Sequence, residues 1–272
     1  MIDSHAHLDS ERYDADRDAM LERAYAAGVR TILSIGIGDG PATMQGALNL
    51  SRAYAGHGGI PKIYATAGVH PHEARLADEA ALQKLDGLLA EEGVLACGEI
   101  GLDYFYDHSP RDEQRTVFGR QMEIAAGRRK PIVIHCRPSN DSTDAWDDTL
   151  EMLDRDWKAT GLGGILHCFT GEWDHARRAM DMGFLISFAG NATFPKAEGI
   201  RDVMAQVPLE KMLIETDAPF LAPAPNRGKR NEPAWVARVA ALVGEVKGVQ
   251  TEEAALRTAE NFERFFGLMS AR

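Results

Sequence analysis

The sequence contains few cysteines and no long hydrophobic run. Its 272 residues include three cysteines, Cys97, Cys136 and Cys168, and no C-x-x-C pair. An odd number of separated cysteines argues against a disulfide framework and against a thiolate zinc site. No stretch approaches the roughly 20 apolar residues that cross a bilayer, and no basic segment followed by an apolar one begins the chain. We therefore expect a cytoplasmic protein with no membrane partner and no obligate protein partner.

Positive charge is scarce as well. The chain has 30 Lys and Arg against 41 Asp and Glu, a formal net charge of -11. Such a surface repels a polyanion, which argues against non-specific binding of duplex DNA, so any nucleic-acid contact must be local. The basic segment 227–230 follows Asp217 closely, and we expect it to bind phosphate. The alternative is a solvated loop, which is the commoner state of a charge run.

The apolar pattern predicts a single domain over residues 1–272, because no linker or low-complexity tract divides the chain. Short β-rich runs alternate with amphipathic stretches, as in repeated βα units. The expected strands lie near residues 1–7, 31–35, 62–67, 95–99, 132–135, 164–167, 184–187 and 212–215. Gly28, Gly127 and Gly183 are the expected stops of three helices, and residues 232–246 and 252–266 are expected to be helical. This order predicts an α/β protein with the (β/α)8 TIM barrel fold, whose active sites form at the carboxyl ends of the strands.

Six histidines and two carboxylates lie at or next to the expected strand ends. They are His5, His7, His70, His72, His135, His167, Glu99 and Asp217. Imidazole nitrogens and carboxylate oxygens are ligands of divalent ions such as zinc, manganese and magnesium. A single histidine is more often a hydrogen-bonded core residue, but a set spread over separate strands predicts a metal site.

The spacing of these residues indicates how they would divide between two ions. His5 and His7 are two residues apart, so both imidazoles should point to the same face of the first strand. We expect them to bind one ion together with Asp217. His135 and His167, which lie on separate strands, are expected to bind the other ion.

The same residues predict a hydrolase. Glu99 has two carboxylate oxygens that can bridge two ions, although a single acidic residue is commonly paired with an arginine instead. Two metal ions generate hydroxide near neutral pH and stabilise the attacking and leaving oxygens of an in-line displacement. Their positive charge would also attract an anionic phosphodiester. Asp217 is also a candidate general base. His70 is expected to bind a phosphoryl oxygen or to protonate the leaving group.

Other residues near these motifs have simpler interpretations. His72 is equally well explained as a loop residue that hydrogen-bonds to the backbone near Pro71. Cys136 and Cys168 each follow a candidate ligand by one residue, so alternation along a strand should turn both thiols away from the metal.

The chain resembles the TatD family of metal-dependent hydrolases over nearly its whole length. The resemblance is carried by residues 2–9 (IDSHAHLD), 68–72 (GVHPH), 98–103 (GEIGLD), 134–137 (IHCR), 166–171 (LHCFTG), 215–221 (ETDAPFL) and 227–233 (RGKRNEP). It implies an amidohydrolase-like, metallo-dependent hydrolase barrel with two divalent ions (magnesium, manganese or zinc). It also implies deoxyribonuclease activity, often as a 3′ to 5′ exonuclease on single strands.

The resemblance also implies individual roles. His5, His7, Glu99 and Asp217 would bind one metal, and Glu99, His135 and His167 the other. His70 would handle the phosphate, and we expect Arg137, Arg227 and Lys229 to contact phosphate as well.

One segment departs from the family pattern. Where the family commonly has a brief loop, residues 138–148 carry four aspartates, which would oppose a long polyanion at the rim of the site. Trp146 in this segment could stack on a base, but packing against the barrel at a helix start is the safer interpretation.

Three functions remain open from the sequence. The first is a metal-dependent phosphodiesterase acting on DNA ends. The second is the same site hydrolysing another ester or amide, such as a D-aminoacyl-tRNA ester or a small lactone, because fold and metals do not fix the substrate. The third is a non-catalytic metal-binding protein, against which stands the complete set of candidate ligands.

Overall fold

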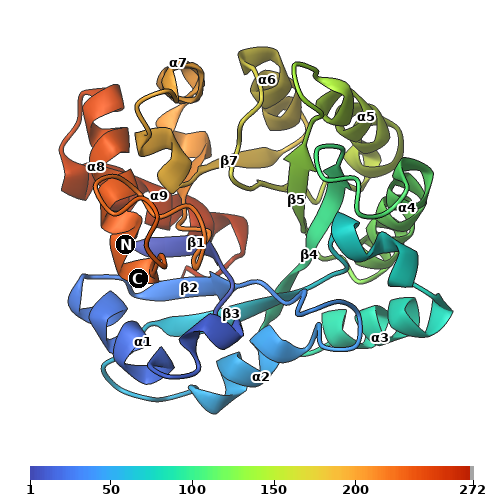
Figure 1. Cartoon of the computed structure of the whole chain (residues 1–272), viewed down its shortest axis with the longest axis horizontal. Coiled ribbons are helices and arrows are strands. Elements are labelled where there is room, and N and C mark those ends of the chain that lie inside the picture. Colours follow the sequence, from blue (N-terminus) through green and yellow to red (C-terminus); the bar gives the residue numbers. More distant parts are fainter. Residues whose placement is uncertain (270–272) are drawn as a thin grey trace.

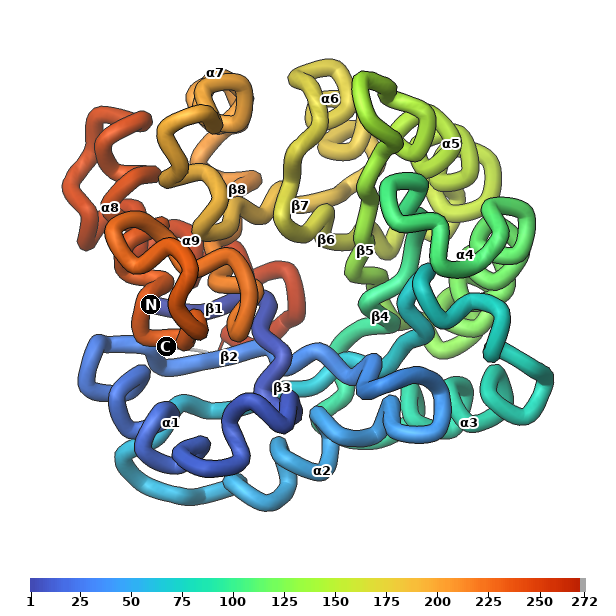
Figure 2. Tube along the Cα trace, in the orientation of Figure 1, coloured from blue at the N-terminus to red at the C-terminus, as the bar shows by residue number. Residues whose placement is uncertain are grey.

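The structure, a computed structural model that describes residues 1–269, is a barrel of eight parallel strands surrounded by helices (Figure 1). The strands are β1 Ile2–Ala6, β2 Thr31–Ser34, β3 Lys62–Ala67, β4 Val94–Asp103, β5 Ile132–Arg137, β6 Gly164–Leu166, β7 Phe184–Phe188 and β8 Met212–Ile214. They pair in chain order from β1 to β8, and Figure 2 shows how the chain follows the ring. His7 N donates to Ala218 O at 2.7 Å and Asp217 N donates to His5 O at 3.0 Å, so the end of β1 meets the segment after β8. The predicted barrel is confirmed.

Helices alternate with the strands as the sequence indicates. They are α1 Arg17–Ala26, α2 Gly46–Ala53, α3 Glu79–Leu89, α4 Arg111–Gly127, α5 Asp144–Met152, α6 Trp173–Asp181, α7 Glu198–Gln206, α8 Val236–Lys247 and α9 Thr251–Phe265. Short helical turns precede several of them, among them η2 Pro71–Leu76 and η5 Gly190–Thr193. α4 ends at Gly127 as predicted, although the left-handed residue that follows the helix is Arg129, with a φ of 52°. No helix in residues 1–269 is long and apolar enough to cross a membrane. The predicted domain also includes residues 270–272, which lie outside the described residues.

The interior of the barrel has an apolar floor and a polar mouth. The floor takes one buried residue from most strands: Ile2, Leu33, Ala96, Val133, Ile165, Leu185 and Leu213. Phe262 of α9 packs with these residues and closes that end. Because side chains alternate along a strand, the residues two positions further on point the same way. In β5 to β8 and the segments that follow them, these are His135, His167, Ser187 and Glu215.

Two register shifts place further polar residues at the mouth. In β1, Asp3 pairs with Ile32 and Ala6 with Ser34, so one extra residue is inserted between the two pairs. In β4, Gly98 lies opposite Val133 while Ile100 lies opposite the next residue of β5, Ile134. An inserted residue reverses the alternation. His5 and Glu99 therefore point into the barrel, where strict alternation would have turned them toward the helices.

Candidate metal centre

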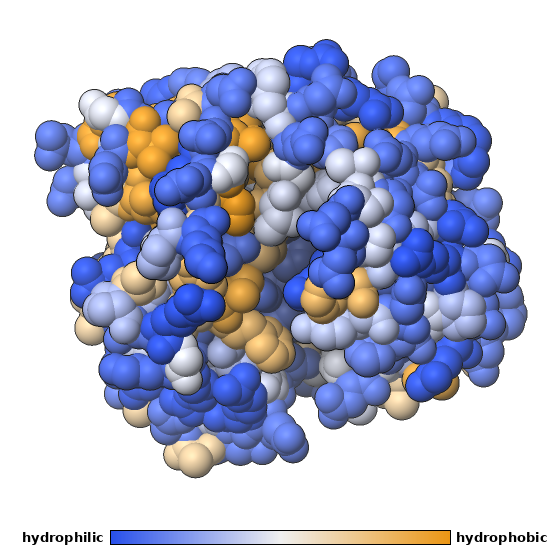
Figure 3. Space-filling view, turned by 45° about the horizontal axis from the view of Figure 1, so that its top comes forward, coloured by the Kyte–Doolittle hydropathy of each residue, from blue (hydrophilic) through white to orange (hydrophobic). Residues whose placement is uncertain are grey.

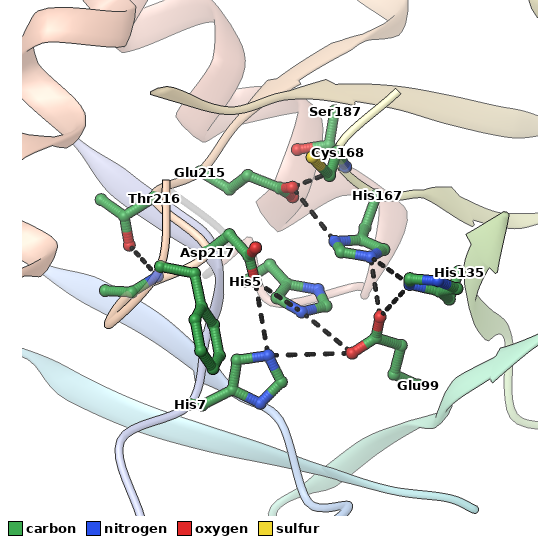
Figure 4. Close-up of polar contacts among 12 residues, drawn as sticks. His5, His7, Glu99, His135, His167, Cys168, Ser187, Glu215, Thr216 and Asp217 are labelled. Carbon is green, nitrogen blue, oxygen red and sulfur yellow. Dashed lines mark hydrogen bonds and ion pairs between the residues drawn. The ribbon is translucent and has the colours of Figure 1, made fainter. Parts of the chain in front are cut away.

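The carboxylate of Glu99 lies at the centre of the barrel mouth, among five imidazoles, of which Figure 4 shows those of His5, His7, His135 and His167. Its Oε2 is 3.4 Å from His5 Nε2 and 3.8 Å from His7 Nε2. Its Oε1 is 2.8 Å from both His135 Nδ1 and His167 Nε2. The two oxygens of one buried carboxylate thus face two different groups of nitrogen donors.

Asp217 completes the group on the His5 and His7 side. Its Oδ1 lies 3.3 Å from His7 Nε2 and 3.7 Å from His5 Nε2. The backbone of Asp217 has a φ of 56°, a conformation that costs energy for a residue other than glycine. The bond from Asp217 N to His5 O and a bond of 2.8 Å from Asn231 Nδ2 to Thr216 O hold this turn in place.

The structure therefore brings together all six residues that the sequence predicts as metal ligands: His5, His7, Glu99, His135, His167 and Asp217. They also divide into two groups on either side of Glu99, as the spacing of the motifs predicts. Their role in binding ions stays a prediction.

The surroundings of His5 fit a divalent ion. The ring is completely buried, and neither of its nitrogens has a hydrogen-bond partner within residues 1–269. It stacks on His167 with ring centroids 3.9 Å apart. Buried polar atoms are nearly always paired, so an unpaired imidazole beside carboxylates calls for a positively charged partner. His5 lies within two groups of possible donors, one with His167 and Glu215 and the other with His7 and Glu99.

The pKa shifts of His5 and Glu99 match the protonation states that metal ligands need, whereas neighbouring carboxylates outweigh burial and raise the pKa values of His7, His135 and His167. Burial and the neighbouring His167 lower the pKa of His5, which keeps its imidazole neutral. Burial alone would raise the pKa of Glu99, but the imidazoles around it, His167 and His5 foremost, hold that pKa well below its usual range. A neutral imidazole and an ionised carboxylate each offer a lone pair to a cation.

His70 lies on the His135 side of Glu99. Its Nε2 is 3.6 Å from Glu99 Oε1, and its Nδ1 accepts a hydrogen bond from His72 N at 3.2 Å. Burial, followed by the charge of His135, lowers the pKa of His70 well below its usual value, so the ring is neutral. Because Nδ1 is an acceptor, the single ring proton belongs on Nε2.

Two further carboxylates, Glu215 and Asp103, contact the candidate histidine ligands. Neither was assigned a role from the sequence. Glu215 accepts a hydrogen bond from Cys168 N at 2.6 Å, and its Oε1 lies 3.3 Å from His167 Nδ1. Asp103 Oδ2 lies 3.1 Å from His135 Nε2. Glu215 lies two residues before Asp217, and Asp103 lies four residues after Glu99. Alternation along the chain was therefore the signal that could have found them.

The structure corrects the interpretation of His72. Its ring does not bond to the backbone near Pro71 but lies with Nε2 2.8 Å from Asp103 Oδ2. Asp103 also accepts hydrogen bonds from the backbone N–H groups of Phe105 and Tyr106. His72 is therefore joined through one carboxylate to the loop after β4 and to His135.

The predicted phosphate contacts lie further out. The guanidinium of Arg137 covers the ring of Phe105 at 4.2 Å, and that of Arg227 covers Phe194 at 4.6 Å. Lys229 Nζ donates to Asn226 Oδ1 at 3.4 Å. None of these cations forms a hydrogen bond or ion pair with the histidine and carboxylate cluster in the described part of the chain.

The two cysteines beside the ligands differ. Cys136 Sγ accepts a hydrogen bond from Thr149 Oγ1 of α5 at 3.5 Å, so it faces away from the mouth as predicted. The prediction for Cys168 assumed that this residue lies in a strand. That assumption was wrong, because β6 ends at Leu166 and the backbone of Cys168 has a left-handed φ of 43°. Its thiol accepts from Asn191 Nδ2 at 3.4 Å, and burial together with Asp217 raises its pKa, so it stays neutral.

The acidic segment 138–148 is partly neutralised by α4. Asp144 pairs with Arg111 at 3.0 Å, and Asp148 pairs with Arg115 at 3.1 Å. The expected repulsion of a polyanion at this rim is therefore weaker than four free carboxylates would give. Trp146 is buried and stacks on His175, which supports the packing interpretation.

A barrel of this type with imidazoles and carboxylates gathered at its mouth defines the class of metal-dependent hydrolases. The family model of the TatD related DNases matches residues 2–267. The chain belongs to the TatD family, and the resemblance drawn from its motifs is confirmed.

Three individual proteins show how close this relationship is. The uncharacterized metal-dependent hydrolase YabD of Bacillus subtilis (strain 168) is 42% identical, over 98% of each chain. The 3'-5' ssDNA/RNA exonuclease TatD of Klebsiella pneumoniae (strain 342) is 32% identical, also over 98% of each chain. The crystal structure of YJJV, a TatD homolog from Escherichia coli K12, superposes with a TM-score of 0.84 at 31% identity over 98% of each chain.

Proposed function

We propose that this hydrolase cleaves phosphodiester bonds of DNA, removing nucleotides from the 3′ ends of single strands with two divalent ions. The observation that carries the proposal is the position of Glu99, whose two oxygens each face a separate set of nitrogen donors. A relative with 32% identity is named a 3'-5' ssDNA/RNA exonuclease, which supports this substrate class.

The residues would hold the ions in two groups. His5, His7 and Asp217 would hold one ion, His135 and His167 the other, and Glu99 would bridge them. When bound, such a pair of ions supplies Lewis-acid activation of water and of the phosphoryl group.

The chain itself would supply binding and proton transfer. Asp217 is ionised, because its contact with His7 outweighs the effect of burial and lowers its pKa, so its carboxylate can accept a proton from the attacking water. His70 carries its proton on Nε2, the nitrogen that faces the centre, and so can donate a hydrogen bond to a phosphoryl oxygen. Arg137, Arg227 and Lys229 would contact phosphate at the rim.

The test compares metal content with activity in two variants. Glu99→Gln should lose bound metal and nearly all cleavage, because it removes the shared charge. Asp217→Asn should lose about 10²- to 10⁴-fold in kcat, the usual share of a general base. Glu253→Gln, which changes an exposed carboxylate of α9, is the matched control.

The assays use single-stranded DNA, duplex DNA, RNA and an aminoacyl-tRNA, each with magnesium, manganese or zinc. Cleavage of single-stranded DNA at the wild-type rate by purified Glu99→Gln would show that the assigned centre is wrong. Hydrolysis of the aminoacyl ester without cleavage of DNA would replace the proposed substrate.

A further inference from the structure

A groove lies beside the candidate centre, between the start of α6 and the segment that joins η5 to α7. Its volume is about 670 Å³. Its lining includes Trp173, Phe194, Pro195, Lys196, Ile200 and Arg227. Figure 1 shows α6 and α7 as neighbours on the rim of the barrel, and Figure 3 shows that a face of the molecule is hollowed near its middle.

The groove is connected to the centre through short stretches of chain. Thr170 and Gly171, which line it, follow His167 by three and four residues. Asn191, another lining residue, donates a hydrogen bond to Cys168 Sγ at 3.4 Å. The N–H of Cys168 in turn donates to Glu215, the carboxylate next to His167. The loop after β6 therefore carries both His167 and part of the groove lining, so the centre and the groove lie on the same side of the barrel.

The chemistry of the lining is aromatic and cationic. The rings of Phe194 and Trp173 are half-buried, and the guanidinium of Arg227 lies 4.6 Å from the centroid of the Phe194 ring. Lys196 adds a second exposed cation, and Glu172 is the one carboxylate of the lining. On a protein with a net charge of -11, this groove is a local excess of positive charge.

An anion that also carries a flat, apolar face matches such a surface best. Bases of a single strand stack on aromatic side chains, while arginine and lysine pair with the phosphates between them. Bases of a duplex already stack on one another and offer no free face. The groove volume lies within the range of ordinary small-ligand sites, about 300–1,000 Å³.

We propose that this groove binds the unpaired nucleotide next to the one being removed, with its base against Phe194 and its phosphate at Arg227 and Lys196. This inference rests on the proposed function and deepens it, because it names the surface that selects single strands. Trp173 forms the second aromatic wall of the same subsite.

The test uses Phe194→Ala and single-stranded oligonucleotides of increasing length. For an octamer, loss of one stacked base should raise KM about 5- to 150-fold with little change in kcat. For methyl p-nitrophenyl phosphate, a small diester without a base, the variant should match the wild type. Phe194→Trp should restore most of the affinity for the octamer, since it restores a stacking face.

Tyr25→Ala is the matched control. Tyr25 is an exposed ring of α1 covered by the guanidinium of Arg30 at 4.2 Å, so it is the same kind of pair outside the groove. This variant should leave KM unchanged for every substrate.

The outcomes separate the two proposals. If wild-type protein cleaves the octamer and Phe194→Ala keeps its KM, the groove proposal is overturned and the proposed function stands. If the wild type cleaves no phosphodiester, the proposed function fails, and binding of a fluorescent octamer to the metal-free protein decides the groove separately. Equal affinity of wild type and Phe194→Ala in that measurement would overturn the groove proposal.

Discussion

At the scale of single residues, Gly101 leaves no room for a side chain next to a candidate ligand. Its φ is 136°, and a Cβ atom there would lie 2.0 Å from the carbonyl oxygen of His135. Gly101 pairs with His135 in the register of β4 and β5, and this close approach brings the His135 ring to the carboxylate of Glu99. A methyl group would have to push the two strands apart.

We expect Gly101→Ala to lower the free energy of unfolding by about 2 kcal/mol or more, because strain and a backbone clash combine. Urea unfolding measures the difference. Gly87→Ala in α3 is the control, since nothing lies within 4 Å of an added Cβ there. It should stabilise the protein by roughly 0.5–1 kcal/mol. Equal effects of the two substitutions would contradict the assigned clash.

The sequence indicates the ligands better than the residues that orient them. His5, His7 and Asp217 could be predicted because they stand in short motifs at strand ends. Alternation from Glu99 could have placed Asp103 at the mouth, but its contacts with His72 and His135 could not be predicted, because these partners approach it from other elements of the barrel. Contacts of this kind depend on tertiary packing, which spacing along one strand does not report.

At the scale of elements, the strands follow from alternating apolar runs, but the register shifts in β1 and β4 do not. A strand with one inserted residue has nearly the same composition as a regular strand. Only the pairing with the neighbouring strand shows that Glu99 is the inserted residue. The side-chain direction of His5 and Glu99 therefore had to come from the three-dimensional structure.

The segment after β8 is tied to the first helix by ion pairs. Arg230 pairs with Asp16 at 2.7 Å, and Arg23 joins Asp16 at 3.2 Å to Glu232 at 2.7 Å. Hydrogen bonds from Arg230 and Arg23 lower the pKa of Asp16 to about 2. The anchored segment carries Arg227, which lines the groove.

This network predicts a pH dependence of stability. A carboxyl group whose pKa is lower in the folded protein stabilises the fold above its ordinary pKa, and this stabilisation is lost as the pH falls from about 4 to about 2. Asp16→Asn should therefore reduce the free energy of unfolding at pH 7 by up to about 1 kcal/mol, since the pair is partly exposed. The difference from wild type should shrink below pH 4 and be mostly lost near pH 2.

Chemical denaturation at pH 7, 4 and 2 measures this effect. Asp202→Asn, at an exposed carboxylate of α7 that makes no ion pair in the described chain, is the control and should show no such trend. A difference between Asp16→Asn and wild type that persists unchanged at pH 2 would rule out the ionic contribution.

The cations of the loop after β8 lead to a prediction about substrate preference. Neutralising Arg227 and Lys229 together to Gln should raise KM for single-stranded DNA roughly 10-fold and flatten its dependence on salt, because phosphate contacts release counterions. Hydrolysis of an uncharged ester should change little. Arg257→Gln, on α9 at the closed end of the barrel, is the control. Unchanged kinetics on DNA would remove these two cations from the substrate path.

At the scale of the whole molecule, the apolar packing that stabilises the barrel lies at one end and the polar candidate site lies at the other. The apolar floor and α9 close one end, while the other end gathers imidazoles and carboxylates, among which His5 forms no hydrogen bond. Both nitrogens of His5 are buried without a hydrogen bond in residues 1–269, although Nε2 lies 3.4 Å from the Glu99 carboxylate. Burial of these nitrogens without a hydrogen bond lowers the free energy of unfolding, and a cation bound at the mouth would offset that loss.

This imbalance predicts that divalent ions stabilise the whole fold. At a free ion concentration of about 100 times Kd, binding to the native state alone adds about 2.7 kcal/mol to the free energy of unfolding, and Tm rises accordingly. His5→Phe should lose most of this gain, since it removes a candidate ligand. In the presence of a chelator, the same variant should be at least as stable as the wild type, because two unpaired buried nitrogens disappear.

Scanning calorimetry with manganese and with a chelator tests both halves of this prediction, using His57→Phe at an exposed position as the control. The control should respond to the ion as the wild type does. If His5→Phe instead gains as much from manganese as the wild type, the ion lies elsewhere in the molecule. If the variant is much less stable than the wild type in chelator alone, His5 has a packing role that its unpaired nitrogens do not explain, and the argument for a cation at the mouth loses its main support.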